Sequence, residues 1–126
     1  MGEDSVGIVR LAYETWNERG PGAIRAMLAQ DAELHDAPEL PDAQVWRGPE
    51  AVVARLEAVA AAMGGGSVEF QGFRAAGGDV VVAMCWRLDR ETEDVQLGQV
   101  FHVVRVSDGM IARIRVFLTE AEALRA

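Results

Sequence analysis

The chain has 126 residues, of which 50% are apolar and 25% are charged. This length is sufficient for one domain with a hydrophobic core, and the composition is that of a globular protein rather than a disordered one. The net charge of −8 argues against a nucleic-acid-binding surface, which needs clustered Lys and Arg. The single cysteine, Cys85, excludes an intrachain disulfide and a cysteine-based zinc site.

The N-terminal segment, residues 1–16, is acidic from Glu3 onward and has no basic region or uninterrupted apolar stretch. It does not resemble a secretory signal, and no segment approaches the ~20 apolar residues that a membrane span needs. We therefore predict a cytoplasmic protein with no membrane partner. Cys85 lies in the apolar run VVVAMCW, which favours a buried hydrophobic side chain over a nucleophile.

Three segments in the first half of the chain have the pattern of helices. The first has Asp4 or Ser5 as its N-cap, and its apolar residues recur at spacings of three and four: Val6, Val9, Tyr13 and Trp16. Residues 20–22 (Gly-Pro-Gly) end this helix and begin a short second one. The third begins after Gly48-Pro49 and ends at residues 64–66, which are all glycine.

Strand patterns occur before the third helix and throughout the second half. Apolar and polar residues alternate over 31–36, and Pro38 and Pro41 then predict a loop that extends to the third helix. Four further strands are predicted over residues 67–74, 80–88, 95–106 and 110–118. Residues 107–109 (Ser-Asp-Gly) are a strong hairpin signal between the last two strands. Thr119 and Glu122 form a capping box for a short closing helix.

This order of elements predicts an α+β fold, with three N-terminal helices packed on an antiparallel sheet. We find no internal repeat and no linker, so we predict a single domain over residues 1–126.

In that order and spacing, five segments resemble the SnoaL-like branch of the nuclear transport factor 2-like superfamily, which includes ketosteroid isomerases and polyketide cyclases. These segments are residues 16–20 (WNERG), 31–36 (DAELHD), 47–52 (RGPEAV), 78–82 (GDVVV) and 101–111 (FHVVRVSDGMI). The resemblance implies a cystatin-like, cone-shaped barrel. In it a curved antiparallel sheet packs on the helices, with a pocket at the open end and a dimer interface on the convex side.

Alternation along the strands indicates which side chains point into the cone. Asp36 shares a face with Ala32 and Leu34, and His102 is the one polar residue on an otherwise apolar face of its strand. We expect both to lie in a pocket whose walls are apolar: Trp16, Trp46, Met84, Trp86, Ile114, Val116 and Leu118. In such surroundings a carboxylate can act as a base, and a histidine can donate a hydrogen bond to a substrate oxygen.

The resemblance suggests roles for this pair. Asp36 falls where similar ketosteroid isomerases have the aspartate that abstracts a proton, and His102 falls where they have a protonated acid in the oxyanion hole. A tyrosine on the first helix of those enzymes would fall at Ala12, so that donor is absent, and we expect Tyr13 to point elsewhere. The aspartate that polyketide cyclases have on the last strand would fall near Val116 and is also absent.

Structural roles are the alternatives for these residues. Asp36 precedes Ala37-Pro38 and could instead cap a turn through backbone N–H groups, and His102 could be a core histidine. We expect His35 to face away from the cavity. A metal site from His35, Asp36 and His102 would need adjacent residues on opposite strand faces to converge, so we predict no metal and no cofactor.

The opposite face of the sheet is predicted to carry four cations, Arg87, Arg105, Arg113 and Arg115, beside Phe117 and other apolar residues. A mixed arginine and aromatic surface is typical of a protein interface, so we predict a homodimer through the convex face.

Two functions remain open. The chain is either a cofactor-independent isomerase, cyclase, dehydratase or hydrolase for an apolar cyclic or polyketide-like molecule, with Asp36 as base and His102 as acid or oxyanion donor. Or it is a non-catalytic binding protein with the same fold.

Overall fold

The computed structural model describes residues 2–62, 67–90 and 93–125. The first half contains α1 (Gly2–Arg19), the 3-10 helix η1 (Pro21–Met27), β1 (Leu28–His35), β2 (Val45–Arg47) and α2 (Pro49–Ala62). The second half contains β3 (Ser67–Ala76), β4 (Asp79–Arg90), β5 (Glu93–Ser107), β6 (Met110–Phe117) and α3 (Glu120–Arg125). No helix in these residues is long and apolar enough to cross a lipid bilayer.

The six strands form one curved sheet in the order β2-β1-β6-β5-β4-β3. The α+β prediction is confirmed, but the sheet is mixed rather than fully antiparallel, because β1 and β6 run parallel. β2 pairs with one edge of β1, and β6 pairs with the other edge. The predicted barrel is wrong: β2 and β3 each have one neighbour, so the sheet stays open.

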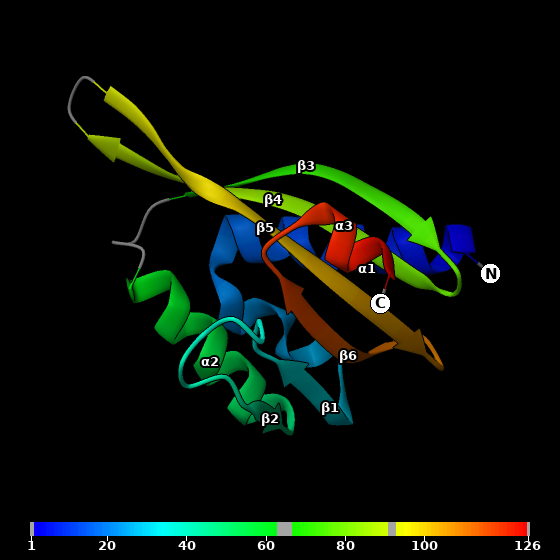
Figure 1. Cartoon of the computed structure of the whole chain (residues 1–126). Coiled ribbons are helices and arrows are strands. Elements are labelled where there is room, and N and C mark those ends of the chain that lie inside the picture. The colour runs from blue at the N-terminus through cyan, green and yellow to red at the C-terminus, as the bar shows by residue number, and fades with distance from the viewer. Residues whose placement is uncertain (1, 63–66, 91–92, 126) are drawn as a thin grey trace.

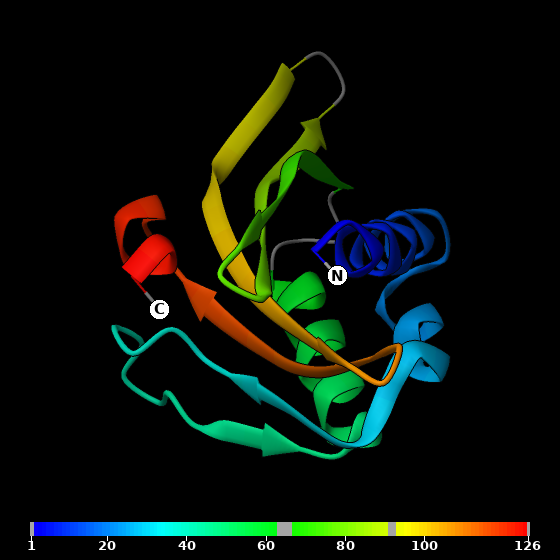
Figure 2. The ribbon, with the colours of Figure 1, turned by 90° about the vertical axis from the view of Figure 1, so that its right-hand side faces the viewer.

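The helices lie on both sides of this sheet (Figures 1 and 2). α1 packs against β3, β4 and β5, while α2 packs against β1, β2 and η1 on the concave side. α3 lies on the opposite, convex side, against β4, β5 and β6. The first two α-helices therefore cover the concave face of the sheet.

Several local features differ from the sequence prediction. α1 begins at Gly2, before the predicted caps Asp4 and Ser5, and the second helix is a 3-10 helix. The segment before α2 that was predicted to be a loop contains the short strand β2. This strand pairs antiparallel with β1, with Trp46 opposite Leu34. The hairpin signal at residues 107–109 is confirmed: Ser107 pairs with Met110, and Asp108 and Gly109 have φ of 53° and 78°.

Strand alternation determines the core. Inward side chains of β4, β5 and β6 join the buried face of α1 in the main cluster, which includes Val9, Val80, Val82, Val104 and Ile114. The outward residues Val81, Phe101 and Val103 pack with Ala123 of α3 in a smaller cluster. The predicted inward positions of Met84 and Ile114 and the outward position of Phe117 agree with these clusters.

Candidate functional site

A cavity of about 130 Å³ lies between the concave face of the sheet, α1 and α2. Among the residues that the structure describes, three polar side chains contribute to its wall: Asp36, Arg55 and His102. The other lining residues are apolar, among them Trp16, Leu56 and Val116. An engineered apolar cavity of ~150 Å³ is known to bind benzene, so this space suits a small aromatic molecule.

Asp36 comes directly after β1, where the alternation of that strand turns its side chain inward. The carboxylate is only 4% exposed. Its Oδ1 accepts a hydrogen bond from Arg55 Nε at 3.0 Å, and its Oδ2 accepts one from Trp46 Nε1 at 3.0 Å. The backbone N–H of Gln44 also donates to Oδ2, at 3.3 Å. Asp36 thus lines the cavity and also accepts a hydrogen bond from the backbone of the following loop. The pocket position and the capping role, which were considered as alternatives, are both observed.

Arg55 is a site residue that the sequence analysis did not identify. It lies on α2 between the buried positions Val52 and Leu56, and its guanidinium lies over the Trp46 ring with Cζ 5.4 Å from the centroid. Its side chain is 26% exposed. The available signal was a charged residue within the apolar stripe of a helix, at helical spacing from Val52 and Val59.

His102 lies on the inner face of β5 and is 4% exposed. Its Nδ1 is 2.8 Å from the Tyr13 hydroxyl, and the Trp16 ring is stacked on the imidazole at 6.3 Å and 26°. Burial lowers the pKa of His102 to about 4, because the imidazolium form would lose its hydration. The ring is therefore neutral near pH 7.

Tyr13 is not among the residues that line the cavity, but its hydroxyl contacts His102 from behind the wall. Tyr13 is fully buried, and its ring makes edge contacts with Phe70 and Phe73 of β3. Ala12 is fully buried as well, so the face that α1 buries is wide enough to bring Tyr13 onto the sheet beside His102. Burial also raises the pKa of the Tyr13 phenol well above its ordinary value.

The residues predicted to line the pocket fall into four groups. Trp16, Val116 and Leu118 contribute to the cavity wall. Met84 and Ile114 are fully buried in the packed core instead, because Ile114 lies deeper along β6 than Val116 and Met84 lies on β4, one strand beyond Val100. Trp46 is outside the wall and donates to Asp36. The side chain of Trp86 is outside the described part of the structure.

His35 does not line the cavity. Its Nε2 lies 2.9 Å from Glu33 Oε1, and Glu33 also pairs with Arg47. These contacts lower the pKa of Glu33, chiefly through the hydrogen bond to His35. Within the residues that the structure describes, no three His, Cys, Asp or Glu side chains gather where they could hold a metal ion.

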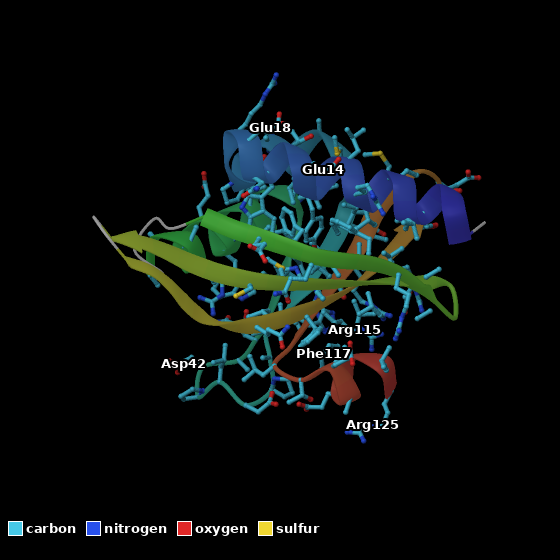
Figure 3. The ribbon with its side chains drawn as sticks, turned by 90° about the horizontal axis from the view of Figure 1, so that it is seen from above. Glu14, Glu18, Asp42, Arg115, Phe117 and Arg125 are labelled. Carbon is cyan, nitrogen blue, oxygen red and sulfur yellow. The ribbon has the colours of Figure 1, made fainter. Side chains whose placement is uncertain are left out.

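The convex face carries an ion network centred on Asp79, which is 6% exposed. Arg105 Nε lies 3.1 Å from Asp79 Oδ1, and Arg115 Nη2 lies 3.5 Å from Oδ2. Figure 3 shows Arg115 and Phe117 on the α3 side of the sheet, with Glu14 and Glu18 on α1 at the opposite side. Two of the four predicted outward cations are thus neutralised in part. The Arg87 side chain is outside the described residues, and the homodimer stays a prediction.

Several solved structures share this fold. TerC, co-crystallised with polyporic acid, has a TM-score of 0.72 at 16% identity, covering 98% of this chain and 99% of that one. A protein from Jannaschia sp. CCS1 assigned as a SnoaL-like polyketide cyclase has a TM-score of 0.71 at 17% identity, over 98% and 90% of the two chains. A protein from Kribbella flavida DSM 17836 assigned as a ketosteroid isomerase has a TM-score of 0.67 at 20% identity, over 94% and 80%.

No curated protein matches the sequence. The family model of the SnoaL-like domain matches residues 9–114, a range that begins in α1, ends in β6 and contains Tyr13, Asp36, Arg55 and His102. The chain therefore belongs to the SnoaL-like domain family.

Proposed function

We propose that this protein is an enzyme that moves a proton at a carbon atom of a small apolar cyclic molecule. Asp36 is the base that accepts the proton, and His102 donates a hydrogen bond to the oxygen on which negative charge develops. The reaction class is that of an isomerase or cyclase without a cofactor. Fold alone does not carry this proposal, because the same fold hosts many activities.

The observation that carries the proposal is the polar composition of the cavity. Asp36 and His102 are separated by 66 residues of sequence, yet both contribute to one small wall that is otherwise apolar apart from Arg55. An apolar space with few convergent polar groups is the usual form of a small-molecule site. It orients a ring and excludes water from the reacting atoms.

The environment of each residue suits its role. The partners of Asp36 all donate hydrogen bonds, so they hold the two carboxylate oxygens in a fixed orientation at the cavity wall. The low pKa of His102, about 4, makes the imidazole a neutral donor at pH 7 rather than a general acid in its charged form. Support of a coarser kind comes from the neighbours assigned as a polyketide cyclase and a ketosteroid isomerase.

The test uses 5-nitrobenzisoxazole, a small bicyclic carbon acid. When a base removes its C–H proton, the electron pair forms a nitrile, the N–O bond breaks, and the oxygen leaves as a coloured phenolate. We expect turnover by the wild-type chain, and a loss of about 100-fold in kcat in Asp36→Asn and in His102→Gln. Binding of the probe, measured by NMR titration, should persist in both variants.

Glu33→Gln is the matched control, because Glu33 is a carboxylate on the same strand that pairs with His35 and Arg47 away from the cavity. It should keep wild-type turnover. Equal turnover by wild type and Asp36→Asn would overturn the proposal. Saturable binding of the probe without any turnover by the wild type would do so too, and would support the binding-protein alternative.

A further inference from the structure

Tyr13 and His102 form a buried pair behind the cavity. The Tyr13 hydroxyl oxygen is 2.8 Å from His102 Nδ1, and the two side chains come from α1 and β5, 89 residues apart. Tyr13 is fully buried and His102 is 4% exposed. Water therefore does not compete for this hydrogen bond, and the pair must satisfy its own donors and acceptors.

The position of the shared proton follows from what each atom can do. If the hydroxyl donates to Nδ1, the neutral imidazole carries its hydrogen on Nε2, on the edge of the ring away from Tyr13. In the opposite arrangement Nδ1–H donates to the phenol oxygen, and the hydroxyl hydrogen is buried with no other acceptor among the contacts of the described residues. A buried hydroxyl donor without an acceptor destabilises the folded state, so the first arrangement is favoured.

The rings around the pair fix its orientation. Trp16 stacks on the imidazole, and Phe73 meets the Tyr13 ring edge-on at 6.3 Å and 85°. The imidazole of His102 and the phenol of Tyr13 cannot reorient without disturbing these packed rings. Because Nδ1 faces Tyr13 and His102 also lines the cavity, the edge of the ring that carries Nε2 is the one left to face the cavity.

We propose that Tyr13 is a positioning residue that holds His102 as the neutral Nε2–H tautomer and so presents a fixed hydrogen-bond donor to the cavity. The use of this donor in a reaction rests on the proposed function, but the tautomer does not. Burial favours the neutral form of both groups, since it raises the pKa of Tyr13 and lowers that of His102 to about 4.

The tautomer is measured directly by ¹⁵N NMR of the whole chain labelled in its histidines, at pH 7. In the wild type we expect His102 to show an unprotonated Nδ1 and a protonated Nε2. In Tyr13→Phe, which keeps the ring, we expect a mixture of tautomers. The chain has only two histidines, so His35 serves as the internal reference and should not change.

A second experiment changes the acidity of the Tyr13 hydroxyl without removing it. Tyr13 is the single tyrosine of the chain, so growth on 3-fluorotyrosine places fluorine only on this ring, next to its hydroxyl. The fluorinated phenol is a stronger donor, and the Nδ1 resonance of His102 should move toward its protonated position. A protonated Nδ1 in the wild type, or a tautomer unaffected by both replacements, would overturn the proposal.

The kinetic readout separates this inference from the proposed function. Tyr13→Phe should lower kcat for 5-nitrobenzisoxazole about tenfold with KM nearly unchanged, because the donor is misplaced while the cavity keeps its shape. If the wild type lacks turnover, the proposed function fails while the NMR result still decides the tautomer. If turnover is present and the tautomer is Nδ1–H, only the role of Tyr13 fails.

Discussion

Arg55 on α2 and Asp36 at the end of β1 are joined by an ion pair of 3.0 Å between Nε and Oδ1 at the cavity wall. Because Asp36 is 4% exposed and Arg55 only 26%, the pair is shielded from solvent and connects the helix to the sheet. Trp46 completes the arrangement from β2, since it donates to Asp36 and packs under the guanidinium. The Asp36 carboxylate is thus held by side chains from β2 and α2, the two elements that follow it in the sequence.

Replacing Arg55 with Met should destabilise the protein by about 2 kcal/mol, because the buried carboxylate loses its cation but keeps two N–H donors. Urea denaturation measures this. Arg47→Met is the control: Arg47 is 71% exposed in its pair with Glu33, so its loss should cost less than about 1 kcal/mol. Equal losses in the two variants would show that the Arg55 pair behaves as a surface contact.

Asp79, the buried acid on the convex face, allows a second test of how a buried charge contributes to stability. Asp79→Asn keeps the shape of the side chain but leaves Arg105 and Arg115 without the carboxylate that they share. Desolvation and the neighbouring Arg113 already lower the pKa of Arg115, so the added repulsion should cost about 2 kcal/mol in urea denaturation.

High salt should restore part of that loss, because screening weakens the repulsion among the arginines. Asp42→Asn, in an exposed loop, should leave stability unchanged under both conditions. A loss in Asp79→Asn that salt does not reduce would indicate that packing, and not charge, is what Asp79 provides.

Much of the fold was predictable because it depends on local patterns. Period-two alternation put Asp36 and His102 on the inner face, and Asp108-Gly109 determined the β5–β6 turn. β2 was missed because three residues are too short to show a period, although Val45 and Trp46 favour strands. The parallel pairing of β1 with β6 depends on contacts between the two ends of the chain, which no local pattern reports.

The partners of the site residues were less accessible to sequence reasoning. Arg55 reaches Asp36 only because α2 folds back over β1, and Tyr13 reaches His102 only because α1 buries both Ala12 and Tyr13. The resemblance to ketosteroid isomerases directed attention to Ala12, the position where their tyrosine would fall. The next residue along α1, Tyr13, is the one that contacts His102.

Filling the cavity should abolish binding of the small probe. Val116 lines the cavity and follows the buried Ile114 along the inner face of β6, so Val116→Phe places a ring in the ligand space. We expect NMR titration with 5-nitrobenzisoxazole to show no saturable shifts. Val45→Phe, on half-buried β2 outside the cavity wall, should bind normally. Unchanged binding in Val116→Phe would place the probe elsewhere.

The buried histidine makes stability depend on pH. The folded pKa of His102, about 4, is below the ~6.5 of an unfolded histidine. Above pH ~6.5 the residue is neutral in both states and contributes nothing to the dependence. Between pH ~6.5 and ~4 only the unfolded chain takes up this proton, so the free energy of unfolding should fall by about 3 kcal/mol in total.

His102→Gln removes that proton uptake, so its stability should fall less between pH 7 and pH 4 in urea denaturation. Glu33, whose pKa is lowered, also loses its stabilising contribution as the pH falls, but it does so equally in both proteins and cancels in the comparison. Parallel pH profiles for the two proteins would mean that His102 protonates as readily in the fold as in the unfolded chain. The neutral donor required for both the proposed reaction and the role of Tyr13 would then be lost at mildly acidic pH.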